Sequence, residues 1–203
     1  KFQYIVSTHS SHIVSESDFD DIKYLKMVNG SIVARNLQSL ENEYKTAGEK
    51  QNYKFLKQYL TLHRAELFFA DKAIFIEGDT ERILLPAMMK KVDQEDSNNP
   101  MLSQNISIVE TGNYSHIFEK FIDFIGVKSL IITDIDSAKK VKKIDASGNE
   151  EKNTDGTNKM ILQKCPVADS SEISTNASLD FFYGSNNLEV FKNKTIAEMT
   201  LKK

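Results

Sequence analysis

Two pairs of acidic residues stand out in this 203-residue chain, because each pair follows a mostly apolar segment. Glu77 comes directly after residues 73–76, and Glu81 follows four positions later, about one helical turn. Asp134 and Asp136 come after residues 127–132. Residues i and i+2 of an extended segment point the same way, so both aspartates are expected to face one site.

Four carboxylates in this arrangement predict divalent-metal chemistry. They cannot all ionise at close range without a counter-charge, and Mg²⁺ or Mn²⁺ prefers oxygen ligands of this kind. Two such ions about 4 Å apart activate a water and stabilise the leaving oxygen in phosphodiester cleavage. The predicted catalytic and metal-binding residues are Glu77, Glu81, Asp134 and Asp136. The alternative is that acidic residues at strand ends only cap helices, a role that we expect for Asp79 or Thr80.

The segments around these carboxylates predict an α/β fold with a central parallel sheet. Residues 73–76, 106–109 and 127–132 are expected to form strands, with helices after residue 80 and over residues 117–125. A strand–helix–strand–helix–strand order with short connections is typical of parallel sheets. Sites in such sheets form beyond the carboxyl ends of the strands. Adjacent strands would therefore bring the four carboxylates together.

The first fifty residues have a different organisation. The apolar residues 2–6 predict a buried strand, and a chain that starts inside a core strand is expected to be part of a longer polypeptide. Residues 11–15 predict a short helix, and Asn29-Gly30 between two apolar runs predicts a hairpin. Residues 37–51 are polar and helix-compatible without a strong apolar face, which predicts a linker.

Four further segments carry weaker signals. Apolar residues recur at helical spacing over residues 52–68, which predicts a helical lead-in to the sheet. Residues 137–159 are almost free of large apolar side chains and predict an exposed insertion. Residues 161–167 predict a strand and residues 177–183 a short helix.

Composition excludes several classes of protein. No apolar run approaches the roughly 18–20 residues of a membrane span, so we expect no integral membrane protein and no membrane partner. No charged-then-apolar secretory signal is visible at the start. A single cysteine, Cys165, excludes an intramolecular disulfide and a multi-cysteine zinc site. Together these features favour the cytoplasm.

Binding to a polyanion would require local patches or metal ions, because the net charge is −3. A run of lysines after the aspartates could hold DNA phosphates near the metal site, although a charge run is more often a solvated surface. The candidate DNA-binding residues are Lys139, Lys140, Lys142 and Lys143. His9 lies in a Ser/Thr-rich turn and could touch a nucleotide phosphate or be a structural histidine. No G-x-x-x-x-G-K-[ST] motif completes a nucleotide site.

Several stretches resemble known families. FIEGDTE at residues 75–81, with TDID at residues 133–136, resembles a Toprim domain, the catalytic unit of topoisomerases, primases and some nucleases. FL at residues 55–56 and RAELFFA at residues 64–70 are similar to the approach to this domain in the OLD (overcoming lysogenisation defect) family of ATP-dependent nucleases. YIVSTHS at residues 4–10 resembles the last core strand and switch-histidine loop of their ABC-type ATPase domain. STNASL at residues 174–179 resembles a late segment of OLD-type Toprim regions.

The resemblance implies a Toprim-like Rossmannoid fold, with residues 1–50 as the end of the ATPase domain and residues 51–203 as a helical lead-in and an incomplete Toprim nuclease domain. It implies that Glu77 is the acid/base or metal-binding glutamate, and that Glu81, Asp134 and Asp136 bind metal. His9 would be the switch histidine that senses the ATP γ-phosphate.

The implied activity is metal-dependent DNA nicking or cleavage regulated by ATP in the full-length protein. A homodimer or higher assembly through the ATPase part is implied, as is a role in anti-phage defence with a partner protein, as in Gabija-type and retron-associated nucleases. The Walker motifs, the signature loop and the later site residues of the family are absent, so this segment alone need not be active. Two alternatives stay open: a topoisomerase- or primase-like Toprim enzyme, and a non-catalytic ATP-gated DNA-binding module.

Overall fold

The computed structural model describes residues 2–62, 65–167 and 172–200, and the chain forms two compact units, Lys1–Ile132 and Thr133–Lys203. The first unit contains a parallel sheet and the second an antiparallel one. The resemblance implies a different division, after residue 50, which is based on similarity to domains of other proteins and not on how this chain packs. That division stays a prediction.

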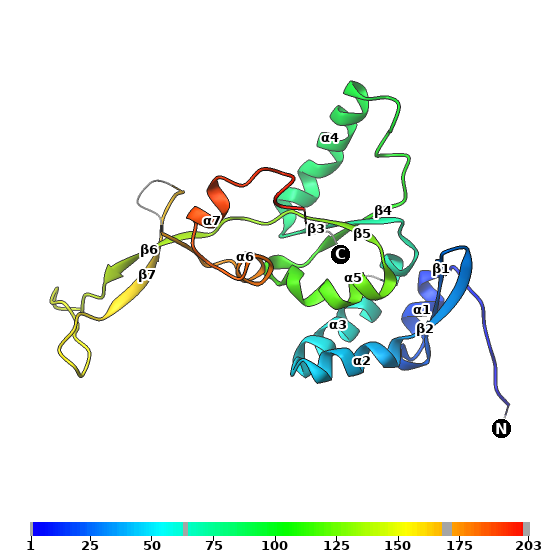
Figure 1. The fold of residues 1–203 in the computed structure, drawn as a ribbon, viewed down its shortest axis with the longest axis horizontal. Helices are drawn as coiled ribbons and strands as arrows, with labels where there is room; N and C mark the ends of the chain where they lie inside the picture. Colours follow the sequence, from blue (N-terminus) through cyan, green and yellow to red (C-terminus); the bar gives the residue numbers. More distant parts are fainter. Residues whose placement is uncertain (1, 63–64, 168–171, 201–203) are drawn as a thin grey trace. The chain divides into compact units, whose positions relative to one another are not determined.

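The first unit is built on a three-stranded parallel sheet with strand order β4-β3-β5 (Figure 1). The strands are β3 (Lys72–Ile76), β4 (Ile106–Glu110) and β5 (Lys128–Ile131). Helix α4 (Asp79–Glu95) connects β3 to β4. A 3₁₀ segment, η3 (Gly112–Phe118), and helix α5 (Glu119–Ile125) connect β4 to β5. The predicted α/β fold with a parallel sheet is confirmed for this region.

Successive residues of β3 point to opposite faces of the sheet, so each face has its own apolar cluster. Ala73 and Phe75 pack in the larger core, which includes residues of α5 and of the preceding helices α2 (Leu37–Thr46) and α3 (Lys50–Leu62). Ile74 and Ile76 pack with Leu85 of α4. Figure 1 shows α4 on one side of the sheet and α2, α3 and α5 on the other.

Helix α4 is amphipathic only in part. Of its apolar side chains, Leu85 and Met89 are buried, whereas Ile83, Leu84 and Met88 are exposed. It is the longest helix in the described ranges, with 17 residues. Among those residues no helix is both long and apolar enough to cross a bilayer.

Helix α2 corrects the prediction that residues 37–51 form a linker. Leu37, Leu40 and Tyr44 are fully buried, and they belong to the larger core. The Tyr44 hydroxyl donates a hydrogen bond to the carbonyl of Ile117 at 2.5 Å. The signal was present as the spacing i, i+3, i+7, which places three side chains on one helical face. Only three large residues form this stripe, so the segment as a whole still looks polar.

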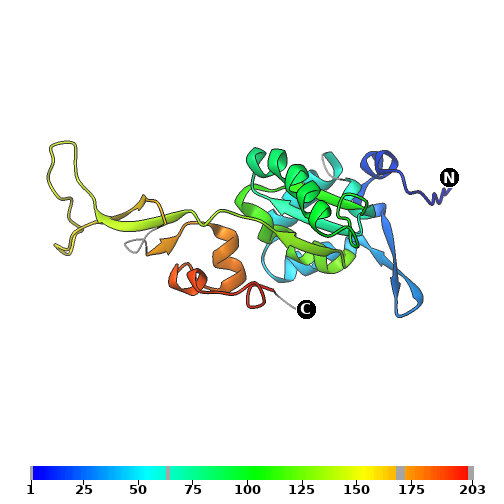
Figure 2. The ribbon, with the colours of Figure 1, turned by 90° about the horizontal axis from the view of Figure 1, so that it is seen from above.

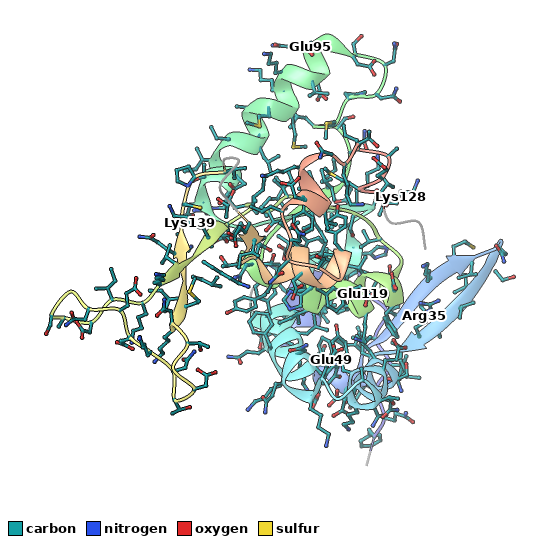
Figure 3. The ribbon with its side chains drawn as sticks, turned by 60° about the vertical axis from the view of Figure 1, so that its left-hand side comes forward. Arg35, Glu49, Glu95, Glu119, Lys128 and Lys139 are labelled. Carbon is teal, nitrogen blue, oxygen red and sulfur yellow. The ribbon has the colours of Figure 1, made fainter. Side chains whose placement is uncertain are left out.

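The hairpin predicted around Asn29-Gly30 is confirmed by β1 (Lys23–Val28) and β2 (Ser31–Asn36), which pair antiparallel. Asn29 and Gly30 have φ values of 50° and 79°, the left-handed conformations of a type I′ turn. Arg35, labelled on β2 in Figure 3, donates to the carbonyl of Phe124 and lies over its ring at 5.6 Å. The guanidinium therefore attaches the hairpin to the last turn of α5.

The apolar residues 2–6 do not form the buried strand that their composition predicts, and this irregular segment continues to residue 10. They have no regular secondary structure, and Phe2 and Ile5 are each 91% exposed. A strand needs a neighbour to pair with its N–H and C=O groups, and the described residues provide none for this segment. The short helix predicted next is confirmed as α1 (Ser11–Glu16), where the Ser10 hydroxyl accepts a hydrogen bond from the N–H of Ile13.

The helical lead-in predicted over residues 52–68 is found as α3 and a 3₁₀ segment after it, η2 (Ala65–Phe69). A separate 3₁₀ turn, η1 (Phe19–Asp21), lies earlier in the chain, before β1. Leu56, Leu60 and Leu67 are fully buried. Arg64, part of the resemblance to the OLD family, lies outside the described residues.

The second unit contains an antiparallel sheet with strand order β7-β6-β8. Its strands are β6 (Ser137–Lys142), β7 (Met160–Lys164) and β8 (Ile173–Ser174), and its helices are α6 (Ala177–Tyr183) and α7 (Glu189–Lys192). In Figures 1 and 2, β6 and β7 form a ribbon that extends away from α6 and α7. The helix predicted over residues 177–183 is confirmed, whereas the strand predicted over residues 161–167 is found as Met160–Lys164 and does not include residues 165–167.

The segment 137–159 is only in part the exposed insertion that its composition predicts. Ser137 and Ala138 are buried, and both pair with β8. The pairing of β6 with β7 continues to Lys142, beyond which residues 144–158 are exposed for the most part. The small side chains of Ser137 and Ala138 fit a crowded position between two strands, which a count of large apolar residues cannot detect.

Candidate active site

Glu77 lies at the carboxyl end of the central strand of the parallel sheet. It follows β3 directly, and its carbonyl accepts a hydrogen bond from the N–H of Gly112 at 3.1 Å. The preceding carbonyl, that of Ile76, accepts from the N–H of Thr111 at 2.9 Å. These bonds fix the backbone on both sides of the Cα of Glu77. The side chain is half-buried and starts where ligands bind in open parallel sheets.

Glu81 lies in the first turn of α4 and has a structural contact there. Its carboxylate accepts a hydrogen bond from the N–H of Gly78 at 2.9 Å, which is the glutamate half of a capping box. The expectation that Asp79 or Thr80 caps this helix is wrong, because Gly78 is the N-cap residue and Asp79 pairs instead with Arg82. Glu81 therefore points back toward the end of β3.

Two substitutions can separate the capping contact of Glu81 from its predicted role as a metal ligand. Glu81→Gln keeps an oxygen that accepts from Gly78, so unfolding in urea should give a free energy within about 0.5 kcal/mol of the wild type. Glu81→Ala removes this oxygen and should cost about 0.5–1 kcal/mol. If Glu81 is also a metal ligand of a DNA-cleaving site, as the sequence predicts, both variants should lose metal-dependent DNA cleavage. Full activity in Glu81→Gln would show that the carboxylate serves only as a cap.

Glu110 is an acidic residue at this end of the sheet that the sequence reasoning missed. It ends β4 opposite Ile76, and its carboxylate lies 3.7 Å from the guanidinium of Arg82. Its position at the end of an apolar strand was the available signal, the same one that singled out Glu77. Three glutamates and one arginine thus lie at or shortly after the carboxyl ends of β3 and β4.

The two predicted aspartates lie in the second unit, in a loop that leaves β5. Strand β5 ends at Ile131, and the N–H of Ile132 still donates to the carbonyl of Phe75 at 2.8 Å. Asp134 is exposed, and Asp136 is one-quarter exposed with its carboxylate 3.3 Å from the ammonium of Lys164. The loop thus begins one residue beyond the last hydrogen bond between neighbouring strands.

Asp136 does not have the extended conformation that the i, i+2 argument assumes. Its φ is 49°, in the left-handed region, which Asp tolerates better than most residues. Its carbonyl accepts hydrogen bonds from the N–H of Thr175 at 2.9 Å and from the Thr175 hydroxyl at 3.1 Å. The directions of Asp134 and Asp136 are therefore set by contacts of the loop and not by strand alternation.

Each unit contains one of the two predicted acidic pairs. Glu77 and Glu81 belong to the first unit, and Asp134 and Asp136 belong to the second. Within the described ranges, no three or more His, Cys, Asp or Glu residues are grouped so that they could hold a metal ion. The meeting of the two pairs stays a prediction. The donor set suits Mg²⁺ or Mn²⁺, because every candidate ligand is a carboxylate oxygen.

The four candidate DNA-binding lysines lie on or directly after β6, where Figure 3 labels Lys139. Strand alternation places Lys140 and Lys142 on one face and Lys139 and Lys143 toward the other. Two of them are already paired with glutamates. Lys142 lies 2.7 Å from Glu150 and Lys143 2.8 Å from Glu151.

These ion pairs change how the lysine run can act. The hydrogen bond from Lys142 lowers the pKa of Glu150, and the one from Lys143 lowers the pKa of Glu151. Both glutamates therefore stay charged at neutral pH and compensate their lysines. Among the described ion pairs, none includes Lys139 or Lys140, which makes these two the stronger candidates for a phosphate contact.

His9 is exposed and precedes α1 in an irregular segment. The adjacent turn is held by a hydrogen bond from the N–H of Ser10 to the hydroxyl of Thr8 at 3.0 Å. This arrangement leaves the imidazole accessible to a ligand. Its role as a nucleotide sensor stays a prediction.

Comparison with known proteins identifies relatives of this chain. Residues 68–136 match the family described as "Overcoming lysogenization defect protein-like, TOPRIM domain". The chain is 33% identical over 161 residues to the protein named Endonuclease GajA of Bacillus cereus (strain HuB5-5), an alignment that covers 74% of this chain and 22% of that protein. It is 29% identical over 140 residues to the Old nuclease of Escherichia phage P2, with 66% of this chain and 22% of that protein covered.

The region that matches the family includes all four candidate carboxylates. The family match begins in η2 and ends at Asp136, so it contains Glu77, Glu81, Asp134 and Asp136. The chain spans about one-fifth of the length of the two curated relatives. No solved structure gives a significant match.

Proposed function

We propose that this chain is the Toprim part of a metal-dependent DNA endonuclease. It carries an OLD-like Toprim domain and is homologous to the nucleases GajA and Old. The observation that carries the proposal is the strand order of the parallel sheet. Strands β3 and β5 are adjacent and parallel, so the chain segments that follow them leave the sheet at the same edge. Glu77 and Glu81 are in the segment after β3, and Asp134 and Asp136 are in the segment after β5.

In this proposal the four carboxylates together hold Mg²⁺ or Mn²⁺. The bound ions would supply an activated water and stabilise the oxygen that leaves the phosphodiester. Glu77 would bind metal or act as the general acid/base. Gly112 and Thr111 hold the backbone of residues 76–77, and Thr175 holds that of Asp136, so the side chains of Glu77 and Asp136 start from defined backbone positions.

DNA would be bound in part by lysines of the β6–β7 ribbon. Lys139 and Lys140 are the better candidates, because Lys142 and Lys143 are compensated by Glu150 and Glu151. Lysine binds phosphate as a point charge without reading bases, so these contacts would favour DNA of any sequence. A nuclease that acts on DNA within a bacterial cell would work in the cytoplasm.

Regulation by ATP is the second part of the proposal. Residues 1–50 would be the end of an ABC-type ATPase domain, with His9 as the residue that senses the γ-phosphate of ATP. The supporting observations are the similarity of YIVSTHS at residues 4–10 to the switch-histidine loop of such domains and the exposed position of His9. A homo-oligomer formed through the ATPase part and a partner protein in anti-phage defence belong to the same proposal.

A plasmid-nicking assay on the protein in its full length tests the function. Supercoiled DNA should become open-circular or linear with Mg²⁺ or Mn²⁺, and EDTA should abolish the conversion. Covalently closed relaxed circles would instead show a topoisomerase, and synthesis of short primers on single strands would show a primase. Retention of DNA without cleavage under either metal would leave a non-catalytic DNA-binding module.

A further inference from the structure

Asn176 is a buried polar residue that connects helix α6 to the aspartate loop, residues 133–136. Its side chain is 1% exposed. The side-chain oxygen accepts hydrogen bonds from the N–H groups of Ser178 at 3.0 Å and Leu179 at 3.2 Å, which caps α6. The side-chain nitrogen donates to the hydroxyl of Thr133 at 2.7 Å and to the carbonyl of Asp134 at 3.0 Å. Both ends of the amide are thus used, one for the helix and one for the loop.

The neighbours of Asn176 bind the rest of the same loop. The Ser174 hydroxyl donates to the carbonyl of Ile135 at 2.6 Å, and Thr175 donates twice to the carbonyl of Asp136. Three consecutive carbonyls of the loop, at residues 134–136, therefore accept from three consecutive residues, 174–176. We call residues 174–176 the loop clamp.

The aspartate loop needs such a clamp because it has no regular secondary structure. Asp136 has a positive φ, a conformation that persists only where surrounding contacts hold it. Thr133 and Asp134 receive their contacts from a side chain that is itself fixed by burial and by the first turn of α6. An asparagine can do this because its amide carries two donors as well as an acceptor with two lone pairs.

We propose that Asn176 is a positioning residue that holds Asp134 in the orientation required to bind a divalent ion. This inference rests on the proposed function, because it takes Asp134 as a metal ligand. Asn176 acts through the backbone and Thr133, so it is not itself a ligand. Contacts that orient metal ligands typically cost about 10–100-fold in metal affinity or activity when they are removed.

Asn176→Ser is the informative substitution. Serine remains a good N-cap residue for α6, but it is too short to reach Thr133 and Asp134 and has one donor in place of two. Asn187→Ser is the matched control. The side chain of Asn187 accepts a hydrogen bond from the N–H of Glu189, the first residue of α7, at 3.0 Å, and it is exposed. Asn176→Asp is the second variant, in case the serine variant does not fold, because it keeps the capping oxygens and removes both donors.

Two measurements on the full-length protein test the role. Free Mn²⁺ measured by electron paramagnetic resonance gives the binding of Mn²⁺ without any reaction. The dependence of plasmid nicking on Mn²⁺ concentration gives a half-saturating concentration and a limiting rate. Circular dichroism establishes that each variant is folded under the assay conditions.

If Asn176 is a positioning residue, its replacement should weaken Mn²⁺ binding, and a high Mn²⁺ concentration should restore the rate of nicking. The half-saturating Mn²⁺ concentration of Asn176→Ser should rise about 10-fold or more, and the limiting rate should return toward that of the wild type at high Mn²⁺. Asn187→Ser should change neither quantity. An unchanged half-saturating concentration, with or without a lower limiting rate, would overturn the inference, because a purely structural role reduces only the amount of folded protein.

Failure of the inference can be told apart from failure of the proposed function. Asp134→Asn should lose Mn²⁺ binding in the resonance measurement if Asp134 is a ligand. If Asp134→Asn binds Mn²⁺ as the wild type does, the metal site itself is wrong. If it loses binding while Asn176→Ser binds normally, only the positioning role is wrong.

Discussion

Each of the substitutions Glu77→Gln and Asp134→Asn should lower the rate of metal-dependent nicking on the order of 10³-fold. The double variant should lose little more activity than either single variant. Residues that act as one unit are strongly non-additive, because removing any member disables the others. Both substitutions keep the size of the side chain and remove its negative charge. The measurement is the initial rate of plasmid nicking at a fixed Mn²⁺ concentration that saturates the wild type.

Matched controls exist in both units. Glu95→Gln changes an exposed glutamate at the far end of α4, where Figure 3 labels it, and Asp180→Asn changes an exposed aspartate in the first turn of α6. Both controls should nick at the rate of the wild type. A double variant of Glu77 and Asp134 that falls by the product of the two single effects would contradict a shared site. It would mean that the two acidic pairs act independently.

The largest effect on stability is expected from Tyr44→Ala, at about 3–5 kcal/mol. The Tyr44 side chain is fully buried, its ring lies 5.8 Å from that of Tyr53, and the ammonium of Lys120 lies 5.1 Å from its centre. Burial raises the pKa of the Tyr44 hydroxyl above its ordinary value. The group therefore stays neutral and remains a donor to Ile117 across the physiological pH range. Alanine would leave a cavity and remove the hydrogen bond to the carbonyl of Ile117.

Urea unfolding followed by circular dichroism measures this loss in free energy. Tyr44→Phe keeps the ring and removes only the hydrogen bond to Ile117, so it should cost about 1–3 kcal/mol. Tyr4→Ala is the control, because Tyr4 is 83% exposed and its loss should leave stability unchanged. If Tyr44→Ala were as stable as Tyr4→Ala, residues 37–46 would behave as the linker that their polarity predicts and not as part of the core.

The elements that sequence alone predicts well are those with strong local signals. The apolar run of β3 followed by Glu77, the Asn-Gly turn of the first hairpin and the helix over residues 177–183 are all found. Each signal depends on residues close together in the chain: a continuous apolar run, two residues that accept positive φ, or a helical spacing between a capping residue and a glycine. The order of strands and helices over residues 73–132 was enough to predict the parallel sheet.

Local pattern failed where distant residues decide the environment. Residues 2–6 are apolar enough for a core strand, but the described chain gives them no partner strand, so they stay exposed. Residues 37–46 look polar, yet Tyr44 is buried because Ile117, 73 positions away, accepts its hydrogen bond. Burial and pairing are properties of two segments, and composition describes only one.

The candidate site also divides into features that local sequence predicts and features that folding decides. The identity of the candidate carboxylates and their place after strands could be derived from residue types and spacing alone. Only the tertiary structure shows that Glu81 also caps α4, that Glu110 ends the strand beside Glu77, and that Asn176 holds the loop of Asp134. The physical reason is that a carboxylate's chemistry is set by its own atoms, whereas its direction is set by hydrogen bonds from residues that are brought to it by folding.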